Sequence, residues 1–165
     1  MDERGSVKTC MSDNDKVLVD TNILVYAYDR SEPEKQRQAS RILDRLALAG
    51  IGVIDTQIMA EFFVAITRKM AVPLSIDEAY ERIQNYARSW PVLRISEMVV
   101  LEAVRGVRDY QFSFWDAQVW AAARLNQIPV VLSEDFNVGS QIEGITFVNP
   151  FSAEFWFEEW ISHSR

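Results

Sequence analysis

The segment "KVLVDTNILVYAYD", residues 16–29, places the strongest constraint on what this chain can fold into. Its apolar run Val17–Val19 is short and unbroken, which is typical of a strand buried on both faces of a parallel sheet. Asp20 ends the run, and the apolar spacing after it favours a helix. A carboxylate therefore stands where a parallel strand passes into its crossover helix, the edge at which open α/β sheets bind ligands. Asp20, Thr21 and Asn22 are also good helix caps, so this segment alone leaves simple capping open.

The rest of the chain alternates strand and helix patterns. Helices are expected after each strand, the first long one starting near Ser31 and ending at Gly50, and others opening at Ser75 and Ser113. This alternation predicts a three-layer α/β domain, with a central parallel sheet of about five strands flanked by helices. The further strands are expected at Ile51–Thr56, Pro91–Ser96, Pro129–Leu132 and Ile145–Val148.

The sequence divides into three parts. Residues 1–15 form a polar extension, residues 16–151 the α/β domain, and residues 152–165 an aromatic helix expected to pack on that domain. A length of 165 residues fits one domain. The apolar runs fall far short of the roughly 20 residues of a membrane helix, and the N-terminus does not resemble a secretory signal. With Cys10 as its single cysteine, the chain is expected in a reducing cytoplasm and without a membrane.

The formal net charge of −7 argues against non-specific nucleic-acid binding through a broad positive field. It does not argue against an acidic metal pocket with a local basic rim, because bound divalent ions reverse the local sign. The composition therefore leaves nucleic-acid chemistry open without indicating it.

Three further acids occupy positions comparable to that of Asp20. Glu61 flanks the apolar stripe of its helix, although a flanking Glu is usually a solvated surface charge. Asp116 shares a helix face with apolar residues, and the competing interpretation is a capping interaction with Ser113. Asp135 follows the fourth strand, as Asp20 follows the first; alternation does not decide between it and Glu134, and turns are rich in Asp for local reasons.

Convergence of these acids at one sheet edge would require protonation or bound cations, because crowded carboxylates repel one another. All-oxygen ligand sets suit Mg²⁺ or Mn²⁺, and two such ions can activate a water and stabilise the leaving oxygen of a phosphodiester. Ser133 is a candidate to hydrogen-bond a metal-bound water or to cap the turn that follows the strand. No His or Cys cluster offers a zinc site, since His163 is the single histidine and lies in the tail.

Five stretches in order resemble the PIN-domain family, and most closely the VapC-type toxins of toxin–antitoxin pairs. They are "VLVDTNILVYAYD", "TQIMAEFFVAITRK", "SFWDAQVWAAA", "VVLSEDFNVG" and "VNPF", and together they cover most of the chain. The N-terminal extension and the aromatic tail depart from a minimal toxin. The resemblance implies a PIN-like, Rossmann-like fold and a Mg²⁺- or Mn²⁺-dependent endoribonuclease holding one or two ions. Its acidic cluster would fall on Asp20, Glu61, Asp116 and Asp135, with Thr21 and Asn22 as helpers.

The same resemblance implies three partners: an RNA substrate, a cognate antitoxin and a second copy of the chain. Two alternatives stay open. An Asp-nucleophile phosphatase would use Asp20 itself, but that chemistry usually has a second acid where this chain has Asn22. A non-catalytic module would bind only a partner protein. The basic residues near the motifs are each more often solvated charges than RNA contacts, and they are Arg30, Lys35, Arg68 and Lys69.

Overall fold

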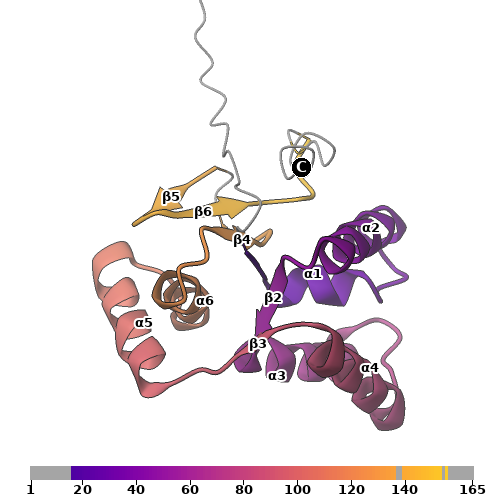
Figure 1. The fold of residues 1–165 in the computed structure, drawn as a ribbon. Coiled ribbons are helices and arrows are strands. Elements are labelled where there is room, and N and C mark those ends of the chain that lie inside the picture. Colours follow the sequence, from indigo (N-terminus) through magenta and orange to yellow (C-terminus); the bar gives the residue numbers. More distant parts are fainter. Residues whose placement is uncertain (1–15, 137–138, 154, 156–165) are drawn as a thin grey trace, which may run out of the picture.

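The computed structural model describes residues 16–136, 139–153 and 155. They form one six-stranded sheet in the order β3-β2-β1-β4-β6-β5, with helices on both sides (Figure 1). All neighbouring strands run parallel except β5, which pairs antiparallel with β6. The strands are β1 (Val17–Val19), β2 (Gly52–Asp55), β3 (Val92–Leu93), β4 (Val130–Leu132), β5 (Gln141–Ile142) and β6 (Ile145–Val148).

Two helices lie on one side of the sheet and the remaining helices on the other (Figure 1). The first side holds α5 (Glu97–Tyr110) and α6 (Phe114–Leu125). The other side holds α1 (Thr21–Tyr26), α2 (Pro33–Ala49), α3 (Thr56–Val64) and α4 (Ile76–Ser89), and the π-helical turn η1 (Ala65–Lys69) continues α3. The predicted three-layer α/β architecture is therefore confirmed.

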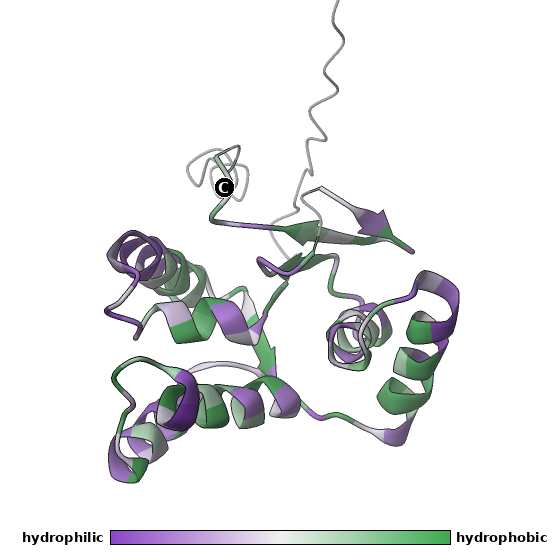
Figure 2. Cartoon of the chain, turned by 180° about the vertical axis from the view of Figure 1, so that it is seen from behind, coloured by the Kyte–Doolittle hydropathy of each residue, from purple (hydrophilic) through white to green (hydrophobic). Residues whose placement is uncertain are grey.

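The central strands have no solvent-facing side. All residues of β1, β2 and β4 are buried, and they are hydrophobic except Gly52 and Asp55 of β2, whereas the helices are striped (Figure 2). This is the pattern expected of parallel strands covered on both faces by amphipathic helices.

Two of the predicted helix ends are present: Gly50 ends α2 in the left-handed conformation, and Ser75 forms a capping box with Glu78 at the start of α4. Ser31 does not cap α2, because the N-cap is Glu32, whose side chain forms no capping hydrogen bond.

The structure differs from the sequence prediction mainly at the sheet edge. The two-residue strand β5 is an addition to the about five strands expected, and it makes the sheet mixed. The polar extension 1–15 and most of the aromatic segment 152–165 lie outside the described residues, as do Cys10 and His163. Among the described residues no helix is both long and apolar enough to cross a membrane.

Candidate functional site

Asp20 lies at the carboxyl end of the central strand β1, where it is the N-cap of α1. Its side chain is buried, with 6% of its surface exposed. One carboxylate oxygen accepts from the Thr21 N–H at 2.7 Å, and the other accepts from the Ser133 hydroxyl at 2.7 Å. Ser133 reaches it because Leu132 pairs in register with Val19, which places the next residue of each strand side by side.

The segment after β4 is joined to the start of α1 by further hydrogen bonds. The Asn22 amide donates to the Asp135 carboxylate at 2.9 Å and to the Ser133 hydroxyl at 3.2 Å. The Ser133 hydroxyl also accepts from the Asp135 N–H at 3.1 Å. Ser133 therefore caps its turn, one of the two roles considered from the sequence, and it also holds the Asp20 carboxylate.

The neighbouring acid Glu134 has a different environment. It accepts from the Tyr26 hydroxyl at 2.6 Å and forms an ion pair with Lys35 at 2.8 Å. Lys35 also lies over the Tyr26 ring, 4.3 Å from its centroid. Asp135 is the more exposed of the two acids, and in the described part of the chain it has no lysine or arginine partner. Of this pair, Asp135 is therefore the acid whose charge is not paired with a lysine or arginine in the described residues.

Glu61 and Asp116 come from helices on opposite sides of the sheet, and both are half-buried. Glu61 on α3 accepts from the Gln57 amide at 2.5 Å. Asp116, in the first turn of α6, accepts from the Ser113 hydroxyl at 2.7 Å, while its own N–H donates to that hydroxyl at 3.2 Å. The capping interaction considered for Asp116 is thus present, and it engages one of the two carboxylate oxygens.

A cavity of about 330 Å³ brings these residues together. All four predicted acids line it, together with Thr21 and Asn22. In the described residues no three His, Cys, Asp or Glu side chains are close enough to hold a metal ion as they stand. The four acids thus share one cavity, and each accepts its hydrogen bond from a neutral donor in place of a lysine or arginine.

The electrostatics of the cavity are set by burial and by like charges. Burial raises the pKa of Asp20 to about 7, against the opposing effect of the hydrogen bonds from Ser133 and Thr21. The negative charges of Asp135 and Glu61 raise this pKa further. A bound cation would oppose both effects, since it stabilises the ionised carboxylate. The oxygen donors present therefore fit a hard divalent ion such as Mg²⁺ or Mn²⁺.

Several residues near the cavity were not singled out from the sequence. Asp55 ends β2 as Asp20 follows β1, so the same strand-end signal was available for it. Its side chain is fully buried and caps α3 by accepting from the Ile58 N–H at 2.8 Å. Gln57 and Trp115 line the cavity, as does Lys69, which was considered from the sequence only as an RNA contact. Gln57 follows Asp55 by two residues, as Asn22 follows Asp20, so a comparable signal was available for it too.

Comparisons with known proteins give a family and a fold. The PIN domain family profile matches residues 17–139, about three quarters of the chain. No curated protein matches the chain significantly in sequence.

Several solved structures share the fold, among them two toxin–antitoxin complexes and a toxin. A toxin–antitoxin complex from Klebsiella pneumoniae superposes with a TM-score of 0.60 at 19% identity, covering 82% of this chain and 98% of that chain. Mycobacterium tuberculosis VapC20, a toxin that cleaves the sarcin–ricin loop, gives 0.54 at 15% identity, with coverages of 70% and 87%. VapBC2 from Rickettsia felis, bound to a DNA fragment from its promoter, gives 0.58 at 13% identity, with coverages of 83% and 97%. At these identities the likeness concerns the fold, whereas the profile match over most of the chain shows that it belongs to the PIN domain family.

Proposed function

We propose that this protein is a Mg²⁺- or Mn²⁺-dependent endoribonuclease and the toxin of a toxin–antitoxin pair. The observation that carries the proposal is the acid cavity, in which Asp20, Glu61, Asp116 and Asp135 face one space without a lysine or arginine partner in the described residues. Other described acids are paired with cations, among them Glu143 and also Glu134, which lines the same cavity. Unpaired acids in a shared cavity are a costly arrangement unless a cation is bound there.

Each residue has a role in this proposal. Asp20 and Asp116 would be the main metal ligands, and Glu61 and Asp135 would complete the set. When bound, the metal would supply an activated water and positive charge for the phosphodiester.

The neutral donors act on the acids. The Ser133 hydroxyl and the Thr21 N–H hold the Asp20 carboxylate, Asn22 orients Asp135, and Gln57 orients Glu61. These donors fix the direction of each carboxylate without neutralising it, so the negative charge stays available for a cation.

The fold likeness to proteins described as toxins and toxin–antitoxin complexes supports the partner assignment. An exposed apolar surface on α5 also favours a protein partner, an antitoxin or a second copy of the chain. Met98, Leu101 and Val104 are 59%, 63% and 54% exposed there, and exposed apolar patches commonly mark interaction sites.

The phosphatase alternative is less well supported. Asn22, two residues after Asp20, is used to hold Asp135 and Ser133, and both Asp20 oxygens already accept hydrogen bonds. A phosphatase of that class would form a phosphoenzyme on Asp20, which rapid quench with a phosphate ester would detect.

The decisive test is an assay on total RNA with Mg²⁺ or with EDTA, followed by mapping of the cut ends. We expect RNA cleavage with Mg²⁺ and none with EDTA. The variants Asp20→Asn and Asp116→Asn should lose cleavage while circular dichroism shows a retained fold. Asp77→Asn, which removes an exposed acid from α4, is the matched control and should cleave normally. Normal cleavage by either site variant would refute the assignment, and a full biological effect of Asp116→Asn would favour the non-catalytic module.

A further inference from the structure

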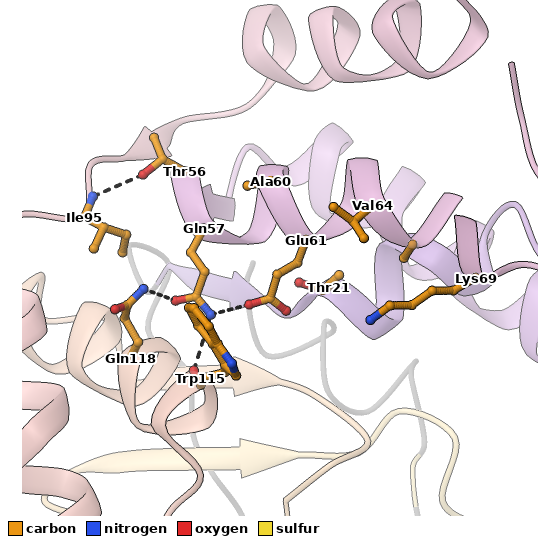
Figure 3. A pocket seen from close by; sticks show the side chains of 11 residues that line it. Thr21, Thr56, Gln57, Ala60, Glu61, Val64, Lys69, Ile95, Trp115 and Gln118 are labelled. Atoms are coloured by element: carbon orange, nitrogen blue, oxygen red, sulfur yellow. Dashed lines mark hydrogen bonds between the residues drawn. The ribbon is translucent and has the colours of Figure 1, made fainter. Parts of the chain in front are cut away.

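A second cavity has a volume of about 490 Å³ (Figure 3). It adjoins the acid cavity, because six residues line both: Thr21, Gln57, Glu61, Ala65, Lys69 and Trp115. Neighbouring parts of one bound molecule can therefore occupy the two cavities. We call this second space the side cavity.

The polar lining of the side cavity consists of a pair of buried amides together with Glu61, Lys69 and two threonines. Gln57 and Gln118 are 9% and 5% exposed, and the Gln118 amide N–H donates to the Gln57 carbonyl oxygen (Figure 3). Gln57 in turn donates to Glu61 at 2.5 Å and to the Trp115 carbonyl oxygen at 3.4 Å. These bonds engage both the amide nitrogen and the carbonyl oxygen of Gln57, whereas the Gln118 carbonyl oxygen has no hydrogen-bond partner in the described part of the chain. The Gln118 side chain is thus held in place by its nitrogen and has its oxygen available to a ligand.

Much of the side-cavity lining is apolar. Trp115, on α6, faces the α3 side chains across the opening (Figure 3). Trp115 is 59% exposed, so a large part of its apolar surface is open to a ligand. Four aliphatic residues also line the cavity, and they are Ala60, Val64, Ala65 and Ile95.

An aromatic plate, an opposing apolar wall and one amide edge are the elements that proteins use to bind unpaired bases. Bases of single-stranded RNA stack on aromatic side chains and hydrogen-bond along their edges. We propose that the side cavity binds a nucleobase of single-stranded RNA adjacent to the phosphodiester in the acid cavity. This inference rests on the proposed nuclease function and names the part of the substrate that the enzyme recognises.

The roles follow from position. Trp115 stacks on the base, and Gln118 contacts its edge. Because Trp115 directly precedes Asp116 on α6, the stacked base and the acid are held by one helical turn. Lys69 lines both cavities and supplies positive charge for the RNA backbone. An antitoxin side chain is the competing occupant, but the amide edge and the lining shared with the acid cavity favour the substrate.

The first test measures RNA binding without cleavage. A fluorescently labelled single-stranded decamer pool is titrated in EDTA and followed by anisotropy. Trp115→Ala should weaken binding by about tenfold, within the 1–3 kcal/mol measured for stacking on one aromatic residue, while Trp115→Phe should retain most of the affinity. Tyr80→Ala, which removes an aromatic of similar exposure from α4, is the control and should bind normally.

The second test asks whether the lost contact is to a base. Once the cut site is mapped, an RNA carrying one abasic nucleotide beside it is compared with the intact RNA. Wild type should bind the abasic RNA about tenfold more weakly than the intact RNA. Trp115→Ala should bind the two RNAs equally well. Gln118→Ala should change which base is preferred at that position.

The two proposals fail separately in these tests. Binding in EDTA that Trp115→Ala weakens and Trp115→Phe retains, by a protein that never cleaves RNA, would refute the nuclease and leave the side cavity as a stacking site. Normal binding and cleavage by Trp115→Ala would refute the side-cavity proposal alone, and would assign that space to another occupant such as a protein partner. A loss in Trp115→Ala that is equal for intact and abasic RNA would refute it as well.

Discussion

Asp55→Asn should stabilise the metal-free protein at neutral and alkaline pH. The Asp55 carboxyl is fully buried, and one oxygen accepts from the Ile58 N–H at 2.8 Å. The other oxygen is buried without a hydrogen-bond partner in the described residues. Burial raises the pKa of Asp55 to about 6, against the backbone N–H groups of Ile58 and Gln57, and the charge of Glu61 adds to the rise.

The sign and size follow from proton linkage. Between the ordinary pKa of 3.8 and the folded-state value of about 6, the folded protein binds more protons than the unfolded chain. The free energy of unfolding therefore falls as pH rises through this window. A rise of about 2 in pKa corresponds to about 3 kcal/mol. Asparagine caps helices as well as aspartate and keeps the bond from Ile58, so the variant should gain about 2 to 3 kcal/mol above pH 7.

Urea denaturation in EDTA at pH steps from 4 to 8 measures this. Wild type and Asp55→Asn should be nearly equal at pH 4 and should diverge until about pH 7. The control is Asp77→Asn, an exposed acid at the start of α4, whose difference from wild type should stay small throughout. If Asp55→Asn is less stable than wild type at pH 8, or if the difference does not grow with pH, the carboxyl is not buried as an unpaired charge.

Three other changes test the structure. Asp20→Asn should keep or raise the stability in EDTA above pH 7, since burial raises its pKa to about 7, and Mg²⁺ should then stabilise wild type alone in thermal melts. Gly52→Ala should cost about 1–3 kcal/mol in urea denaturation, because the new Cβ would lie 2.3 Å from the Trp90 ring; an unchanged midpoint would contradict that packing. Lys35→Met should lower stability by about 1 kcal/mol or less through loss of the partly exposed Glu134 pair, and 1 M NaCl should shrink the difference.

Much of the fold follows from one rule. Short unbroken apolar runs predict buried parallel strands, and the observed β1, β2, β4 and β6 lie inside the predicted ranges. The edge strand β5 was not predicted, because two residues carry no periodic signal and its pairing with β6 depends on the turn at Glu143 and Gly144. The local sequence thus predicts where the central strands lie, whereas the edge strand depends on its pairing with β6.

In the candidate site, too, the sequence predicts some contacts and not others. Asp20 and Ser133 could be placed together from sequence, because parallel strands end at the same edge and the two residues follow paired positions. The Gln57–Gln118 contact could not, since it joins two helices across 61 positions and Gln118 lies inside α6, away from any strand end. Asp55 obeyed the strand-end rule but was not recognised, because an acid that caps a helix looks the same in sequence whether or not it is fully buried.

The two acids after β4 show why residue type alone could not assign the site. Glu134 and Asp135 are adjacent, and both line the acid cavity. Glu134 has a lysine within 2.8 Å, so its charge is neutralised inside the protein. Asp135 has only the Asn22 amide, which orients the carboxylate and leaves its charge in place. A cation entering the cavity gains more from the second kind of carboxylate, because the first must give up its lysine before it can bind. Lys35, which is 99 positions from Glu134 in the sequence, therefore favours Asp135 as the proposed ligand.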